Sequence, residues 1–265
     1  MTIYADLFRY RDLFANLFRR DFQSRYKGSA LGILWSLANP LVLMAIYVLV
    51  FSLLWRVTDE IPHYPLYLLS GLAAWIFFST SLSAAARSML DQAPLIRKTR
   101  FPRQLVPLSA VATQLVTFAV MLVVLLVLNM ALIPDVRATA WLALPLGVVF
   151  VGIAGGLAVA VAAANVIFRD VEHLIGSLLL PWFFLTPVLY SFDQIAEFDR
   201  HPTLVAVLRW GNPITPPIEA IRAPLWEGRL PRVADVAYLC VASAAALALG
   251  AWVFRRVDDR IAVEL

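Results

Sequence analysis

Residues 138–168 read ATAWLALPLGVVFVGIAGGLAVAVAAANVIF, a stretch without a single Asp, Glu, Lys or Arg. A transmembrane helix needs about 20 mostly apolar residues, and an ionised side chain at its centre costs roughly 2.5–3.5 kcal/mol on insertion scales. Five more charge-free stretches of sufficient length lie on either side of this one: residues 28–55, 61–86, 104–134, 173–192 and 236–254. The sequence therefore predicts an all-α, polytopic membrane protein with six transmembrane helices.

The composition agrees with a membrane protein. The apolar fraction is 61% and the charged fraction is 15%, against roughly 45–50% and about 25% in soluble domains. The only cysteine, Cys240, lies in the last apolar stretch and is interpreted as a packed residue. We expect residues 1–265 to form one membrane domain, with spans at 31–55, 66–86, 105–133, 141–164, 174–192 and 236–254.

The distribution of cations predicts the orientation of the chain. Fifteen of the 22 Lys and Arg residues lie before the first span, between spans two and three, between spans four and five, and after the last span. Lys and Arg are enriched in short cytoplasmic loops. Both termini are therefore predicted to be cytoplasmic, and the net charge of +4 reflects this bias rather than binding to nucleic acid.

Residues 5–27 have the pattern of an amphipathic helix at the membrane interface. Leu7, Phe14 and Leu17 belong to an aromatic and aliphatic face, whereas Arg19 and Lys27 belong to a basic face on the opposite side. Such a helix either anchors the N-terminus on anionic lipid or forms a cytoplasmic gate that guides the substrate.

Three of the predicted spans contain prolines or glycines that are expected to affect the helix or its packing. Pro40 in the first span, and Pro181 and Pro187 in the fifth, are expected to interrupt their helices. Gly152 and Gly156 in the fourth span form a GxxxG pair, which is expected to pack against a neighbouring helix of the bundle.

Three loops differ in character. Residues 87–104 combine cations with apolar side chains that could dock into a groove of a partner. Residues 168–173, FRDVEH, form either a hydrated turn with local ion pairs or a contact site for a cytoplasmic partner. Residues 193–235 are too long for a structureless loop, and two short amphipathic helices are expected there, with Glu219 and Arg222 paired on one of them.

Several kinds of chemistry are missing from the sequence. Three histidines in separate loops and one cysteine give no metal-ligand cluster. Neither Lys27 nor Lys98 follows a glycine, so the chain lacks a P-loop. Ion-driven transporters carry ionisable residues inside the membrane, and the six apolar stretches carry none away from their ends. We therefore expect a non-enzymatic subunit without a cofactor of its own, whose energy is supplied from outside.

Five sequence blocks carry a resemblance to a known family. In chain order they are RDFQSRYKGSALGILWSLANPL (20–41), IRKTRFPRQLVPLS (96–109), NVIFRDVEHLI (165–175), PWFFLTPVLY (181–190) and NPITPPIEAIR (212–222). Together they resemble the membrane subunit of type-2 ABC exporters for polysaccharides such as O-antigen and wall teichoic acid. The resemblance spans nearly the whole chain.

The resemblance implies partners and a location. It implies a homodimer in the plasma (inner) membrane, bound to two copies of a cytoplasmic ATPase subunit that holds the ATP. The exported substrate would be a lipid-linked polysaccharide, with residues 5–27 near its cytoplasmic entrance and residues 193–235 forming an outer gate.

The resemblance also implies roles for particular residues. Spans one and five would line the path of the sugar with aromatic side chains: Trp35, Tyr47, Phe51, Trp182, Phe183, Phe184 and Tyr190. Coupling to the ATPase would fall to two cytoplasmic segments: Arg97, Lys98, Arg100, Phe101 and Arg103 in the first, and Arg169, Asp170 and Glu172 in the second. The outer gate would include Asn212, Pro213, Glu219 and Arg222.

A basic interface helix suits a substrate with a phosphorylated lipid, because arginine binds phosphate with two parallel hydrogen bonds. We hypothesise that Arg19, Arg20, Arg25 and Lys27 attract that phosphate. Three alternatives remain open at this point: a type-2 ABC exporter of a drug or lipid, an intramembrane enzyme of glycan or lipid assembly, and a scaffold that recruits a cytoplasmic enzyme.

Overall fold

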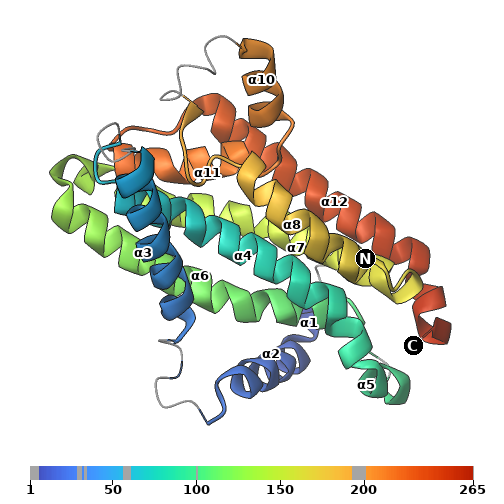
Figure 1. The fold of residues 1–265 in the computed structure, drawn as a ribbon. Coiled ribbons are helices and arrows are strands. Elements are labelled where there is room, and N and C mark those ends of the chain that lie inside the picture. Colours follow the sequence, from blue (N-terminus) through green and yellow to red (C-terminus); the bar gives the residue numbers. More distant parts are fainter. Residues whose placement is uncertain are drawn as a thin grey trace.

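The computed structural model describes residues 6–28, 32, 35–55, 61–99, 101–192 and 201–264, and within these ranges the chain is helical with no strand. The prediction of an all-α fold is confirmed (Figure 1). The main helices are α1 (Asp6–Arg9), α2 (Arg11–Tyr26), α3 (Trp35–Trp55), α4 (Tyr64–Asp91), α5 (Ala93–Lys98), α6 (Leu105–Leu132), α7 (Ala143–Ile167), α8 (Val171–Leu185), α10 (Pro202–Trp210), α11 (Thr215–Arg222) and α12 (Val233–Glu264).

The long helices run alternately in opposite directions between two ends of a bundle. At the end that carries α5, Arg103 donates a hydrogen bond to the Asp258 carbonyl at 2.6 Å, and Gln104 donates one to Asp6 at 2.6 Å. The α5 end therefore holds both the α1 helix and the last turns of α12 (Figure 1). The opposite end carries α10 and α11 and is called the α11 end below.

Four helical segments of the described residues are long and apolar enough to cross a membrane: Tyr64–Asp91, Leu105–Leu132, Ala140–Ile167 and Val233–Ile261. The other two expected spans correspond to α3, with 21 residues, and α8, with 15. At 1.5 Å per residue, α8 is only about 22 Å long, shorter than the hydrocarbon core of about 30 Å. The number of six spans therefore stays a prediction.

The early end of α8 has a local cause in the sequence. Thr186 precedes Pro187, and a residue before proline avoids the helical conformation. Thr186 is extended, with φ −99° and ψ 132°, and the helix ends at Leu185. The expected span 174–192 is thus helical only as far as residue 185. Pro181 and Pro40, in contrast, lie inside α8 and α3.

Helix α4 lies at the centre of the bundle, in contact with α3, α6, α7, α8 and α11. Its ring of Phe77 stacks on Phe118 of α6 at 4.7 Å, and Phe118 in turn lies 6.2 Å from Phe150 of α7. These three buried rings join three helices. The stability of the bundle therefore depends on α4, against which every other span except α12 packs.

The GxxxG pair of α7 packs against α12, as the sequence predicts. A Cβ atom on Gly152 would lie 2.0 Å from the hydroxyl oxygen of Ser243. A Cβ atom on Gly156 would lie 2.3 Å from the backbone carbon of Ala246. The two helix backbones approach so closely that only glycine fits at both positions.

The N-terminal segment forms two helices, α1 and α2, instead of a single one. Leu17 on the predicted apolar face is buried, and α2 packs against the first half of α6. The hydroxyl of Ser109 on α6 donates a hydrogen bond to Asp21 at 3.0 Å. The basic face of α2, with Arg19 and Arg20, is exposed.

The loop expected at 193–235 contains the two short helices that the sequence predicts, α10 and α11. Helix α11 is buried along most of its length, and a π-helical turn at Ala223–Glu227 continues it. Gly228 then has φ 67°, and a Cβ atom there would lie 2.9 Å from the carbonyl oxygen of Asp135. This glycine closes the turn that leads toward α12.

Candidate functional site

A groove lies between α3, α4 and α8 and is called the α3–α8 groove below. Its volume is about 630 Å³. Aromatic side chains line one part, including Tyr47, Trp75 and Phe183, and the hydroxyl groups of Ser79 and Ser83 line another. Aromatic rings offer flat apolar faces and hydroxyl groups are adaptable hydrogen-bonding partners. This combination of rings and hydroxyls suits the contact of the groove with a sugar chain.

The groove continues toward the α5 end. A neighbouring cavity of about 440 Å³ shares Ser83 and Gly176 with it and is also lined by Arg87, Glu172 and His173. Arg87 and Glu172 lie 3.4 Å apart as an ion pair. The groove and this cavity together extend along α4 and α8, from the turn before α8 to the rings of Tyr47, Trp75 and Phe183.

The seven aromatic residues predicted to line the path divide into groups. Tyr47 and Phe183 line the groove, with ring centroids 6.1 Å apart. Trp182 points away from it, into α4, where its ring lies 5.2 Å from Phe78. Phe184 is 55% exposed on another face of α8. These four residues of α3 and α8 therefore do not share one surface.

The remaining three aromatic residues also differ in position. Trp35 lines a neighbouring cavity between α3, α4 and α6. Tyr190 lies beyond the end of α8, and its hydroxyl donates a hydrogen bond to the carbonyl of Phe184 at 3.2 Å. The side chain of Phe51 lies outside the described residues.

Four of the predicted coupling residues line a hollow of about 560 Å³ at the α5 end: Arg97, Lys98, Phe101 and Arg103. Arg97 and Lys98 are exposed at the end of α5. Arg103 is held by Asp258, with a side-chain distance of 3.2 Å. Arg100 lies outside the described residues.

The turn before α8 is anchored by a buried asparagine. Asn165 donates a hydrogen bond to the carbonyl of Ala86 at 2.8 Å and accepts one from the backbone N–H of Glu172 at 2.9 Å. Arg169 and Asp170 are exposed. The ion pair between Glu172 and Arg87 joins the turn to α4, and both interpretations of the turn stay predictions.

The four cations proposed to bind lipid phosphate lie in different surroundings. Arg19 and Lys27 are exposed, and Arg20 forms an ion pair with Asp21 at 3.1 Å. Arg25 instead donates a hydrogen bond to Gln114 of α6 at 2.5 Å. The structure thus separates Arg25 from the other three cations.

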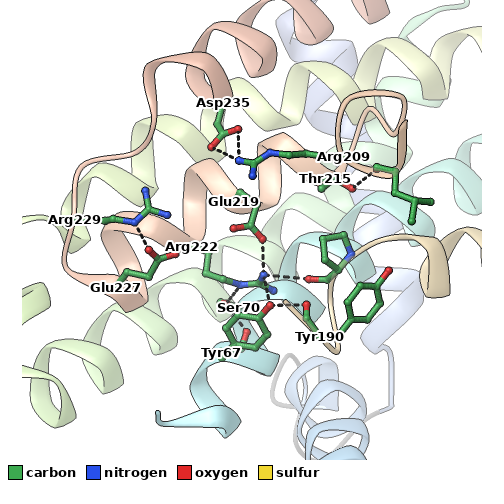
Figure 2. Close-up of polar contacts among 12 residues, drawn as sticks. Tyr67, Ser70, Tyr190, Arg209, Thr215, Glu219, Arg222, Glu227, Arg229 and Asp235 are labelled. Carbon is green, nitrogen blue, oxygen red and sulfur yellow. Dashed lines mark hydrogen bonds and ion pairs between the residues drawn. The ribbon is translucent and has the colours of Figure 1, made fainter. Parts of the chain in front are cut away.

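At the α11 end, Arg222 is 1% exposed and lies in a dense network (Figure 2). One terminal nitrogen donates to Glu219 at 2.9 Å, to the Tyr67 hydroxyl at 2.9 Å and to the Pro187 carbonyl at 3.1 Å. The guanidinium also lies over the Tyr67 ring, 3.8 Å from its centroid. The predicted pair of Glu219 and Arg222 is confirmed as part of this larger network.

Glycine makes room for this guanidinium. A Cβ atom on Gly71 of α4 would lie 2.5 Å from the second terminal nitrogen of Arg222. That nitrogen is buried and has no hydrogen-bond partner among the described residues. The side chain is therefore enclosed by α4 as well as by its own helix.

Burial raises the pKa of Glu219 above its ordinary value, and the charge of Arg222 opposes this effect. Glu227 and Asp235 raise this pKa further, whereas Arg209 lowers it. We therefore expect the protonation state of Glu219 to depend strongly on whether Arg222 is present.

The segment after α8 accepts hydrogen bonds from Arg222 and from side chains near it. Because residues 186–191 are not helical, their carbonyl groups need donors from elsewhere. Tyr64 donates to the carbonyl of Leu189 at 3.0 Å, and Tyr67 donates to that of Tyr190 at 2.7 Å. Arg222 supplies the donor for Pro187. Side chains of α4 and α11 thus replace the missing helical hydrogen bonds.

Two further contacts hold α10 and the loop before α11 in place. Arg209 of α10 reaches both carboxylate oxygens of Asp235 at 3.1 Å (Figure 2). The predicted gate residue Asn212 is buried and accepts a hydrogen bond from the indole of Trp182 at 2.9 Å. Pro213, beside it, is half-buried. Asn212 therefore links the loop between α10 and α11 to α8.

Sequence reasoning missed several residues of these sites. Tyr67 and Ser70 are 155 and 152 residues from Arg222, so no local pattern connects them. Asn39, Gln114 and Thr117 stand out only as polar residues in apolar stretches. Among the described residues, no group of three or more His, Cys, Asp or Glu side chains could hold a metal ion.

Comparison with known proteins identifies the family. The model of the ABC-2 type transporter family matches residues 12–226. The chain is 36% identical over 264 residues to the O-antigen export system permease protein RfbA of Myxococcus xanthus, covering 99% of this chain and 98% of that protein. It is also 34% identical over 210 residues to a protein of the same name from Klebsiella pneumoniae, covering 75% and 78%. The chain belongs to the ABC-2 type transporter family.

Proposed function

We propose that this chain is the channel-forming membrane subunit of an ATP-driven exporter that moves a lipid-linked polysaccharide of the O-antigen type out of the cytoplasm. The observation that carries the proposal is the likeness, over nearly the full length of both chains, to an O-antigen export permease. The aromatic and hydroxyl lining of the α3–α8 groove has the chemistry that contact with a sugar chain needs.

The groove suggests that two copies of the chain act together. Apolar residues of the two helices that border it, Ile46 of α3 and Leu178 of α8, are exposed. A second copy facing this side would enclose a channel between two grooves, and most soluble oligomers are symmetric assemblies of one chain. The homodimer is therefore part of the proposal.

The motive force is assigned to a separate ATPase at the α5 end. An ABC-2 permease works with an ABC ATPase, and the α5 hollow presents Arg97 and Lys98 to solvent. This end is then the cytoplasmic side of the plasma membrane, and both termini lie in the cytoplasm. The cation bias of the loops supports this orientation.

Filling the groove is expected to block export. Gly176 lines the groove, and a Cβ atom there meets nothing within 4 Å, so the backbone of α8 accepts a side chain at this position. Gly176→Trp places a bulky ring at the wall of the groove. We expect this variant to assemble normally but to lose most ATP-driven movement of lipid-linked glycan into proteoliposomes that contain the ATPase.

Val148→Trp is the matched control, because Val148 is 73% exposed on α7 and lies outside the groove. Its export should equal that of the unchanged chain. Normal glycan export by the Gly176→Trp variant would contradict the proposed path, and ATP-driven export of an unrelated drug or lipid without glycan export would contradict the proposed cargo.

Reversing the charge at the α5 hollow is expected to weaken binding of the ATPase. In Arg97→Glu/Lys98→Glu, two exposed cations become anions, and mismatched charges at an interface reduce the association rate and the specificity. Co-purification of the ATPase with the tagged permease measures the effect. Arg19→Glu/Arg20→Glu, on the exposed face of α2, makes the same change in charge and should retain the ATPase.

A further inference from the structure

A second cavity lies beside the groove, on the other side of α3. It has a volume of about 410 Å³, lies between α3, α4 and α6, and is called the α3–α6 cavity. Its far part is apolar and includes Phe77, Phe118 and Met121. The cavity and the groove share five lining residues: Arg25, Asn39, Ile76, Thr80 and Gln114. The two spaces therefore meet beneath α3.

The residues at this junction are mostly polar and include a cation. Gln114 is 8% exposed and uses its carbonyl oxygen to accept the hydrogen bond from Arg25 at 2.5 Å. Its amide nitrogen is a donor, as are the guanidinium of Arg25 and the amide of Asn39. Thr117 also lines the cavity, and its hydroxyl is buried without a partner among the described residues. Donors and a positive charge gathered at one point favour an anion.

The apolar surroundings of the junction make such an anion part of a lipid. Gln114 lies nine residues inside α6 from Leu105, which is about 14 Å along the axis of this apolar helix. A free anion gains little by leaving water for apolar surroundings. A lipid phosphate, in contrast, reaches it together with an apolar chain, and the α3–α6 cavity has the apolar walls that such a chain needs.

We infer that Arg25, Asn39, Gln114 and Thr117 bind the phosphate of the lipid-linked glycan while its hydrocarbon chain occupies the α3–α6 cavity and its first sugars enter the α3–α8 groove. This inference rests on the proposed function for the identity of the cargo. The three chemical parts of the ligand match three adjoining environments: apolar, cationic and donor-rich, and aromatic with hydroxyls. The site thus provides a route for the substrate beneath α3.

The inference reduces the number of cations proposed to bind the phosphate from four to one. Arg19, Arg20 and Lys27 do not line either cavity, whereas Arg25 lines both. Arg19 is therefore a matched control for Arg25, since both are arginines of α2 with an exposed side chain and only one reaches the junction.

The test measures binding of photoactivatable polyprenyl phosphate to the purified full chain in phosphatidylcholine nanodiscs. Arg25→Gln is expected to weaken binding by about tenfold or more, the effect of removing a charged hydrogen-bond donor, and Arg19→Gln to leave it within about twofold. Thr117→Val, which keeps the side-chain shape, should also weaken binding, and Arg25→Lys should retain part of it. The uncharged polyprenol should bind equally to all variants.

Equal binding of polyprenol and polyprenyl phosphate, or equal losses in Arg19→Gln and Arg25→Gln, would overturn the inference. A competition experiment identifies the source of the phosphate. If phosphatidylglycerol displaces the probe as effectively as a glycan-bearing polyprenyl phosphate does, the assignment to the cargo is overturned. Full export by Arg25→Gln would overturn this inference alone. A wild-type complex that binds the probe but exports no glycan would overturn the proposed function alone.

Discussion

Arg222→Met is expected to destabilise the protein by about 3–5 kcal/mol, the usual cost of removing one partner from a buried ion pair. The methionine fills similar space but leaves Glu219 without its cation and the Pro187 carbonyl without its donor. The substitution also removes the buried terminal nitrogen that lies beside Gly71. Unfolding in detergent, followed by circular dichroism during titration with a denaturing surfactant, measures the loss.

The pH dependence of this variant follows from Glu219. Burial raises the pKa of Glu219, and Arg222→Met removes the charge that lowers it, so the pKa rises further. A carboxyl group with a raised pKa in the folded state stabilises the fold below its unfolded pKa and loses that contribution as the pH rises through the folded pKa. The cost of Arg222→Met should therefore be greater at about pH 8 than at about pH 5.

Two controls accompany this prediction. Adding Glu219→Gln to Arg222→Met should remove the pH dependence, because the titrating group is gone. Arg232→Met, at an exposed arginine before α12, should change the stability by less than about 0.5 kcal/mol. An equal loss in the two arginine variants would show that the buried network contributes nothing specific.

Gly156→Ala is expected to destabilise the bundle by about 1–3 kcal/mol or more, the range for overpacking a well-filled interior. The new methyl group would lie 2.3 Å from the backbone carbon of Ala246 and 2.4 Å from its oxygen. A helix backbone cannot yield as a flexible side chain does, so α7 and α12 would have to separate. The same surfactant titration measures the effect.

The neighbouring Gly155 is the matched control, because a Cβ atom there meets nothing within 4 Å. Gly155→Ala should be neutral or stabilising by up to about 1 kcal/mol, since alanine is the better helix former. Equal stability of the Gly155→Ala and Gly156→Ala proteins would contradict the close approach of α7 and α12.

The sequence was sufficient for features that depend on local periodicity. The apolar face of residues 5–27, the pairing of Glu219 with Arg222 and the packing of Gly156 all follow from spacing along one helix. The early end of α8 agrees with the expected interruption at Pro187, although the predicted span continued to residue 192.

Features that depend on contacts between distant parts of the chain could not be predicted from the sequence. The hydrogen bond between Arg25 and Gln114 joins residues 89 positions apart, and only the packing of α2 on α6 distinguishes Arg25 from Arg19. Likewise, the aromatic residues of α8 share one apolar stretch, yet Phe183 lines the groove while Trp182 packs on α4. Neighbours on a helix point in different directions, and composition does not reveal which direction meets a cavity.

The break after α8 has a mechanical consequence. The three carbonyl groups of Pro187, Leu189 and Tyr190 rely on donors from α4 and α11. Movement of α11 away from the segment would remove the donor of the Pro187 carbonyl, and movement of α4 would remove those of Leu189 and Tyr190. In apolar surroundings no water replaces a lost donor. The segment and its two supporting helices are therefore obliged to travel as one rigid body whenever this end of the protein rearranges.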